Sequence, residues 1–317
     1  MSGGTSPVAF LKAFGSYLPA REVSNEEIGA LVGCDSEWIR NVSGIESRRF
    51  AAADETVVDM AYKAGLKCLE RAGLRPLDLS MILVASGSSE RQFPGPASKV
   101  AHLFGLDSVP AVDLPMASCG SLFGISLASK LAATTGNILV IGAEKMSSIV
   151  MRQPMDRGIA VLFGDGAGAC LVTPDNGVAR IVDSELHSDG AFADELKVEF
   201  NSPLQMNGRA VILQATRKIP RVITGVFERN SLAVSQAQVF LMHQANQNLI
   251  LKIAASLEVS PDRFYSNIAR YGNTSSASML IAADEWCQAE GFNPGVPVCF
   301  AAFGAGFHWG ALLALGT

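Results

Sequence analysis

One stretch, D-L-P-M-A-S-C-G-S-L-F-G-I-S-L-A from Asp113 to Ala128, constrains the fold more than any other part of the chain. Its first residues continue a short apolar run that follows Pro110, which predicts a buried strand. From Gly120 onward, apolar residues recur at helical spacing around small ones. The strand must therefore turn sharply into a helix, with small and reactive residues at the corner.

Ser118 and Cys119 occupy this corner, at the predicted N-terminus of the helix. Unpaired backbone N–H groups and the positive end of the helix dipole favour a developing anion there. Such a corner can hold a nucleophile, or it can be a tightly packed turn without chemistry. The corner alone favours the second interpretation, so the choice depends on the rest of the chain.

The composition predicts an α/β fold. Hydrophobic residues make up 49% of the 317 residues and charged residues 17%, which is ample for strands that are buried on both faces and covered by helices. Periodicity predicts core strands at 8–14, 81–86 and 137–143 and a helix over 54–73 that ends at a glycine.

Several classes of partner are excluded by charge and patterning. The net charge is −5 and no run of Lys or Arg occurs, so neither nucleic acid nor an anionic membrane is an expected partner. There is no apolar run of about eighteen residues and no apolar signal core, so a cytoplasmic protein is expected. The six cysteines show no C-x-x-C pairing, so no disulfide framework, metal site or resident cofactor is expected.

The second half of the chain repeats the sequence pattern of the first. Residues 74–86 and 232–244 both run from a leucine through a polar turn into an apolar strand. The F-G-x-G segments at Phe163 and Phe303 also match. We predict two duplicated halves, 1–173 with the nucleophile and 174–317 with the other reactive residues; the alternative is chance similarity from shared α/β composition.

Two further residues could do chemistry. His243, one of four histidines, follows the predicted strand 239–242 at its carboxyl end, where α/β sheets bind ligands. Asn273 lies in Y-G-N-T-S-S-A-S, before a predicted helix near Ser276. Taken separately, such residues are structural more often than catalytic.

Taken with the corner at Ser118, these segments make the chain resemble the β-ketoacyl-acyl-carrier-protein synthase III family of thiolase-fold condensing enzymes over nearly its whole length. The resemblance rests on five motifs in order: DLPMASCGSLFGISLA, DRGIAVLFGDGAGA, HQAN at 243–246, YGNTS at 271–275 and FGAGFHWGA at 303–311. It implies a five-layered αβαβα fold built from two similar halves, and a homodimer.

The resemblance also implies a reaction. A nucleophile at the corner takes an acyl group from acyl-CoA, and His243 and Asn273 then bind the carbonyl of a malonyl thioester as CO2 departs. The backbone N–H groups of the nucleophile and of Ala305 form the oxyanion hole. The reaction would be a starter step of fatty-acid or polyketide synthesis.

The chain departs from the family at the nucleophile. An ungapped alignment places Ser118 at the position of the family's cysteine, and a helical rotation of about 100° per residue turns Cys119 toward the core; a gap would make Cys119 the alternative nucleophile. A serine requires a general base, for which His243 is the candidate, with Asn273 as orienter or carbonyl donor. The alternative is that Ser118 is an engineered replacement made to trap a substrate complex.

A serine nucleophile keeps other functions open. A seryl ester reacts less readily with carbon than a thioester does, so condensation would be slower, or the acyl group would pass to oxygen or nitrogen of a small-molecule acceptor. The third alternative is a non-catalytic subunit of a heteromeric ketosynthase.

The expected partners follow from the resemblance. Trp38 and Arg157 match the residues that hold the adenine of CoA, and Phe93 matches a residue that closes the acyl pocket of the neighbouring subunit, or could plug its own. Docking of an acyl carrier protein is in doubt because the family's basic residues are replaced here, by Val42, Leu213, Asn248, Ala255 and Ser256. His308 is expected to be a packed or hydrogen-bonded histidine, and the glycine-rich 164–168 a closely packed strand and no phosphate loop.

Overall fold

The computed structural model describes residues 9–317. The strand predicted at 8–14 is present as β1 (Ala9–Tyr17), although Val8 lies outside the described residues. Nine strands of the described chain form one mixed sheet, in the order β11 (Val239–Met242), β12 (Pro297–Gly304), β13 (His308–Gly316), β8 (Ala179–Ser188), β1, β7 (Asp165–Thr173), β6 (Ile138–Lys145), β4 (Met81–Ala85) and β5 (Ala111–Leu114).

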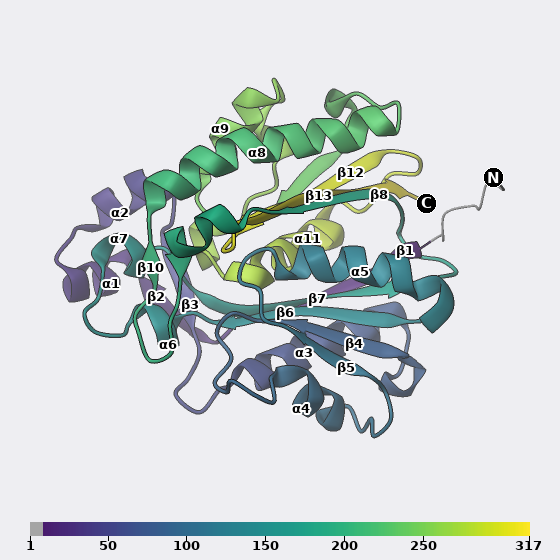
Figure 1. Ribbon diagram of the computed structural model, residues 1–317, viewed down its shortest axis with the longest axis horizontal. Coiled ribbons are helices and arrows are strands. Elements are labelled where there is room, and N and C mark those ends of the chain that lie inside the picture. The colour runs from purple at the N-terminus through teal and green to yellow at the C-terminus, as the bar shows by residue number, and fades with distance from the viewer. Residues whose placement is uncertain (1–8) are drawn as a thin grey trace.

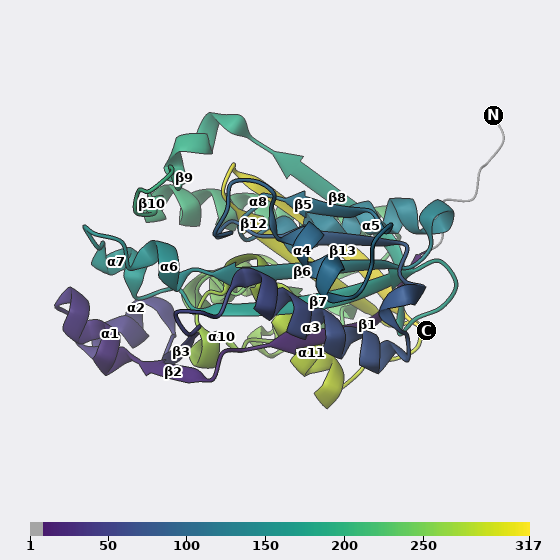
Figure 2. The ribbon, with the colours of Figure 1, turned by 90° about the horizontal axis from the view of Figure 1, so that it is seen from below.

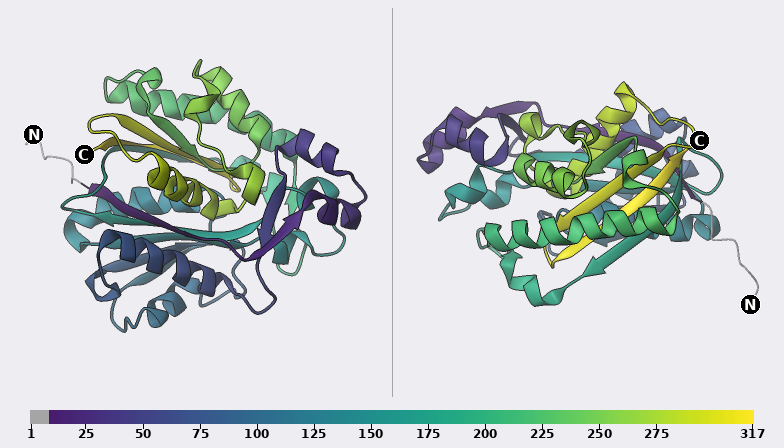
Figure 3. Two further views of the ribbon diagram at one scale, coloured as in Figure 1. Left: turned by 180° about the vertical axis from the view of Figure 1, so that it is seen from behind. Right: turned by 90° about the horizontal axis from the view of Figure 1, so that it is seen from above.

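The sheet doubles over at the β1–β8 pairing, so its two parts stack face to face (Figures 1 and 3). Between them lie α5 (Gly120–Thr135) and α11 (Ser278–Ala289). The outer faces are covered by α3 (Val57–Ala72) and α4 (Pro96–Leu103) on one side, and by α8 (Gly208–Arg229) and α9 (Gln247–Ser256) on the other. The result is the expected five-layered αβαβα arrangement.

Successive side chains along each strand pack into different layers of the core. On β6, Val140 packs in the central core around α5 and α11, whereas Ile141 packs against α3 and α4. On β11, Leu241 enters the central core and Phe240 packs under α8 and α9. Successive side chains point to opposite faces of a sheet, which is why these strands are apolar throughout.

The predicted repeat corresponds to matching structure. A 3-10 turn precedes β4 at Pro76–Asp78 and another precedes β11 at Val234–Gln236, at equal positions of the two thirteen-residue segments. The orders β4-β6-β7-β1 and β11-β12-β13-β8 share the same pattern of one parallel and then two antiparallel pairings. The fold therefore contains two duplicated halves; the boundary at 173/174, between β7 and β8, stays a prediction.

Local signals place the helix ends. The helix predicted from Asp54 begins at Val57, because Thr56 caps it in a reciprocal pair with Asp59. It ends at Gly73, as predicted. The glycine-rich segment is the fully buried strand β7, where a Cβ on Gly168 would lie 2.5 Å from the Cβ of Leu280, so close packing explains its glycines.

Short elements gather at one end of the molecule (Figure 2). They are β2 (Arg21–Ser24), α1 (Asn25–Val32), α2 (Ser36–Ser43), β3 (Ser47–Phe50), α6 (Ser147–Val150), α7 (Arg157–Ala160), β9 (Leu196–Lys197), β10 (Gln205–Met206) and α10 (Ile268–Tyr271). Several of them form the wall and mouth of the pocket described below.

Candidate active site

The corner between β5 and α5 presents Ser118 and hides Cys119. Ser118 has a φ of 63°, in the left-handed region, and its side chain lines a pocket. Cys119 is the N-cap residue of α5 and is fully buried, with Sγ donating to the carbonyl of His308 at 3.1 Å. Burial raises the pKa of the Cys119 thiol well above its usual value. Of the two residues, Ser118 is therefore the one that a substrate in the pocket can reach.

The turn between β12 and β13 lies against this corner. A Cβ on Gly304 would lie 2.7 Å from both the carbonyl oxygen of Ala117 and the Cβ of Ser118, so only glycine permits this approach. The backbone N–H of the next residue, Ala305, donates to no oxygen among residues 9–317. The N–H of Ser118 already donates to Ser275 Oγ at 2.9 Å. Of the two donors expected for an oxyanion, one is thus free and one is engaged.

His243 follows β11 directly and is buried at the pocket wall. Its Nδ1 lies 2.6 Å from Oγ of Ser278, which also accepts the N–H of Gln244. Burial lowers the pKa of His243 to about 4, and a hydrogen bond to the backbone of Ser275 counteracts this shift. The ring is therefore neutral at pH 7 and able to accept a proton.

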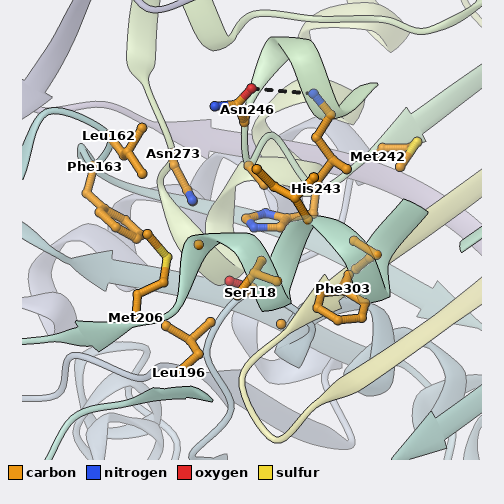
Figure 4. A pocket seen from close by; sticks show the side chains of 18 of the residues that line it. Ser118, Leu162, Phe163, Leu196, Met206, Met242, His243, Asn246, Asn273 and Phe303 are labelled. Carbon is orange, nitrogen blue, oxygen red and sulfur yellow. Dashed lines mark hydrogen bonds between the residues drawn. The ribbon is translucent and has the colours of Figure 1, made fainter. Parts of the chain in front are cut away.

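Asn273 is held on both sides. Its backbone pairs with the segment 162–164, and its Oδ1 accepts the N–H of Ser275 at 2.8 Å. The amide Nδ2 is the remaining group, and Figure 4 shows it directed into the pocket toward Ser118 and His243. Asn273 is thus a donor to the pocket. Nδ1 of His243 pairs with Ser278 Oγ, and this contact favours the role of Asn273 as carbonyl donor over that of orienter of the ring.

The three side chains meet at the inner end of one cavity of about 260 Å³ (Figure 4). The other walls are mostly apolar and come from α8, α9, the ends of β11 and β12, the loop after α7 and the short elements. Their apolar residues are Leu162, Phe163, Leu196, Met206, Val211, Ile212, Ala215, Ile219, Met242, Leu249, Ile253 and Phe303. Ligand pockets commonly combine such a lining with a few polar groups. The structure therefore brings Ser118, His243 and Asn273 together, although they are far apart in the chain.

The mouth of the cavity carries Trp38 and Arg157 in contact, with the guanidinium carbon 5.3 Å from the ring centroid. Val42 lines the same mouth. Leu213 is exposed and follows the pocket residue Ile212 in the chain. The three other replacements, Asn248, Ala255 and Ser256, are exposed on α9. The five positions at which the family's basic residues are expected therefore carry no charge, although the exposed Arg209 and Arg217 lie one turn from Leu213 and the exposed Lys252 lies between Asn248 and Ser256.

Two further residues lie outside the cavity. Phe93 is 84% exposed, so the alternative in which it plugs a pocket of its own chain is wrong. His308 packs edge-on against Phe123, and its Nδ1 pairs with Ser188 Oγ at 2.7 Å. The expectation of a hydrogen-bonded, packed histidine is confirmed.

Sequence reasoning missed Ser275, Ser278 and Glu144, which contact the site residues or each other. The serine-rich run after Asn273 is a signal that could have indicated the first two. In residues 9–317 no group of three or more His, Cys, Asp and Glu side chains could hold a metal ion. None of the helices in that range is long and apolar enough to cross a membrane.

A thiolase-like fold with a serine hydroxyl, a histidine and an asparagine amide in one mostly apolar pocket is the arrangement of a condensing enzyme of the acyltransferase class. The family described as "3-Oxoacyl-[acyl-carrier-protein (ACP)] synthase III" matches residues 112–190. The family described as the C-terminal part of the same synthase matches residues 227–315.

Individual proteins agree with this assignment. Beta-ketoacyl-[acyl-carrier-protein] synthase III of Gloeobacter violaceus is 34% identical, covering 97% of this chain and 98% of that protein. The crystal structure of the Aquifex aeolicus synthase III has a TM-score of 0.93 at 31% identity, over 97% and 99% of the two chains. The priming beta-ketosynthase of the R1128 polyketide pathway has a TM-score of 0.90 at 29% identity, over 97% and 96%. The chain belongs to the 3-oxoacyl-acyl-carrier-protein synthase III family.

Proposed function

We propose that this enzyme transfers an acyl group from acyl-CoA to Oγ of Ser118 and then joins it to a malonyl thioester with loss of CO2. The observation that carries the proposal is the convergence of Ser118, His243 and Asn273 in one apolar cavity. The family relationship and the priming ketosynthase among its structural neighbours support a starter step of fatty-acid or polyketide synthesis.

In the first half-reaction, Oγ of Ser118 attacks the thioester carbonyl while His243 takes the hydroxyl proton. A serine hydroxyl does not ionise at neutral pH, so it needs this base. The N–H of Ala305, with Ser118 N–H as a shared donor, stabilises the tetrahedral oxyanion. The C–S bond then breaks, and the CoA thiolate takes the proton from His243.

In the second half-reaction, the malonyl carboxylate leaves as CO2 and its bonding electrons form an enolate. Donors on His243 and Asn273 Nδ2 stabilise the enolate oxygen. The carbanion attacks the carbonyl carbon of the seryl ester to form the new C–C bond, the C–O bond to Ser118 breaks, and the departing alkoxide takes a proton from solvent water. No metal or resident cofactor takes part in either step.

At the mouth, Trp38 and Arg157 are proposed to hold the adenine of CoA between them. A planar base packed against both groups needs about 7 Å between them, since carbon atoms pack 3.5–4 Å apart. The 5.3 Å contact must therefore open when CoA binds. The uncharged side chains of Val42 and Leu213 cannot themselves pair with an acidic carrier protein, so we propose free CoA thioesters as the substrates.

We also infer a homodimer. Among the strands of residues 9–317, β5 has one neighbour, β4, and its other edge is open. Val112 on β5 and Leu127 and Leu131 on α5 are exposed apolar side chains beside this edge, and Phe93 projects from the loop before α4. An open edge with apolar side chains is suited to pairing with another chain.

A second candidate is transfer of the acyl group to oxygen or nitrogen of a small molecule, favoured by the serine in place of cysteine. The test is intact-mass analysis after incubation with a panel of acyl-CoAs, for the parent, Ser118→Ala and Cys119→Ala. The proposal expects one acyl adduct that is lost only in Ser118→Ala. An adduct that depends on Cys119 would restore thiol chemistry, and no adduct at all would favour a non-catalytic subunit.

Malonyl-CoA then separates the two transfer reactions. Condensation releases CO2 and gives a product two carbons longer than the acyl group. Transfer to another acceptor gives neither result, so absence of malonyl consumption across the panel excludes condensation.

A further inference from the structure

Glu144, near the end of β6, is a buried carboxylate that the proposed reaction does not use. It accepts hydrogen bonds from the N–H of Gly87 at 3.0 Å and from the hydroxyls of Ser88, Ser275 and Ser276. None of the Lys and Arg side chains in the described chain forms an ion pair with it. Burial of a carboxylate without a cation is costly. The presence of several hydrogen-bond donors around Glu144 therefore needs an explanation.

Ser275 connects this carboxylate to the candidate catalytic residues. Its Oγ donates to Glu144 Oε1 at 2.9 Å and accepts the N–H of Ser118 at 2.9 Å. Its own N–H donates to Asn273 Oδ1 at 2.8 Å. A single buried serine therefore contacts the backbone of the nucleophile and the side chain of the amide donor.

The carboxylate decides which way the Ser275 hydroxyl points. Oε1 of Glu144 accepts the hydrogen bond from the Ser275 hydroxyl, so the Ser275 proton faces Glu144. The lone pairs of Oγ then face the N–H of Ser118. Because Asn273 Oδ1 is occupied by Ser275 N–H, its Nδ2 is left to face the pocket.

The two halves of the fold are shaped for this contact. Glu144 belongs to the first half and Ser275 to the second, on the 3-10 turn Ser275–Ala277 before α11. Gly142 precedes Glu144 by two residues on the same face of β6, and a Cβ there would lie 2.3 Å from the carbonyl oxygen of Ser276. A glycine at this position lets the turn approach β6 closely enough to reach Glu144.

We propose that Ser275 is a positioning residue that fixes both the Ser118 backbone and the Asn273 amide, and that Glu144 is its anchor. The inference rests on the proposed function, because it assigns Ser118 and Asn273 the roles given above. Ser275 acts through these two residues and does not itself touch the substrate.

The test compares Ser275→Ala and Glu144→Gln with Ser88→Ala as the matched control. Ser88 also donates to Glu144 but contacts neither Ser118 nor Asn273. The assay measures the rate of Ser118 acylation and its KM, with the acyl-CoA that acylates the parent fastest.

We expect kcat to fall about 10- to 100-fold in both test variants, because small displacements of reacting groups have effects of this size. KM should stay within about threefold, since the walls of the pocket are unchanged. Ser88→Ala should retain the kcat of the parent, and Glu144→Asp should retain more activity than Glu144→Gln. Equal loss in Ser275→Ala and Ser88→Ala, or an unchanged kcat in Ser275→Ala, would overturn the inference.

A second measurement separates this inference from the proposed function. If the parent forms no adduct with any acyl-CoA, the proposed function fails, and amide hydrogen exchange of Ser118 then tests the contact directly. Ser275→Ala should speed this exchange about tenfold, as loss of one hydrogen bond implies, whereas Ser88→Ala should not. Equal exchange in all three proteins would refute the positioning role.

Discussion

Nδ1 of His243 lies 2.6 Å from Oγ of Ser278, and the same oxygen accepts the N–H of Gln244 at 3.0 Å. The Ser278 hydroxyl can accept a hydrogen bond from Nδ1–H with its second lone pair, or it can donate a hydrogen bond to an unprotonated Nδ1. The first arrangement leaves Nε2 as a base, and the second makes Nε2–H a donor. One serine therefore supports both roles that the proposed reaction requires of His243.

Loss of this hydroxyl should slow both half-reactions. We expect Ser278→Ala to lower the rates of acylation and of CO2 release about 10- to 100-fold, the usual effect of removing a group that orients a catalytic histidine. Rapid-quench mass analysis measures the first rate and CO2 release the second. Ser126→Ala is the control, because it removes a buried hydroxyl that pairs with Ser184 away from the cavity. Ser278→Ala with the parent's rates would contradict the assignment.

The acylation rate should depend little on pH near neutrality. Burial lowers the pKa of His243 to about 4, so the base form predominates throughout pH 6–8. The rate should fall only in more acidic solution, as the ring becomes protonated near pH 4. The measurement is a pH profile of adduct formation at saturating acyl-CoA. A decline centred near pH 6.5, the usual value for histidine, would show that the ring is not desolvated in the enzyme.

The same buried ring should make the folded state sensitive to acid. His243 has a pKa of about 4 in the folded protein and about 6.5 when unfolded. Between these values the unfolded chain binds more protons, so stability falls as pH falls from 6.5 to 4. The linkage amounts to about 3 kcal/mol at most. Chemical denaturation at pH 7 and pH 5 should show a smaller loss for His243→Asn than for the parent; equal losses would contradict burial of a neutral ring.

The fold and the reactive corner could be predicted because they depend on local patterns. The strand ending at Leu114 and the helix starting at Gly120 follow from apolar periodicity and small residues. The burial of Cys119 follows from helical rotation at the same corner. His243 was recognisable because it directly follows an apolar strand.

Contacts between distant segments could not be predicted in this way. Glu144 and Ser275 are separated by 131 positions, and neither periodicity nor composition indicates that they meet. Ser278 is in the first turn of α11, where a serine is ordinary, and its partner His243 lies 35 positions away. Hydrogen-bond partners of this kind become visible only when the two halves are folded together.

Thiol reactivity should distinguish the two corner positions. In the parent, iodoacetamide should modify the partly exposed Cys34 and leave Cys119 unlabelled, because burial raises the pKa of the Cys119 thiol. In Ser118→Cys the new thiol faces the cavity at the helix N-terminus and should be labelled faster than Cys34. Peptide mass analysis measures each site. Rapid labelling of Cys119 in the native parent would show that the corner is oriented differently.

The open edge of β5 should mediate self-association. Leu131 and Leu127 are exposed on α5 beside this edge, and a charge placed among apolar side chains at an interface is strongly unfavourable. We expect sedimentation to show a dimer for the parent and a monomer for Leu131→Glu. Leu77→Glu is the control, since Leu77 is also an exposed leucine but lies in the 3-10 turn before β4. A monomeric parent, or a Leu131→Glu variant that remains dimeric, would contradict a dimer formed through this face.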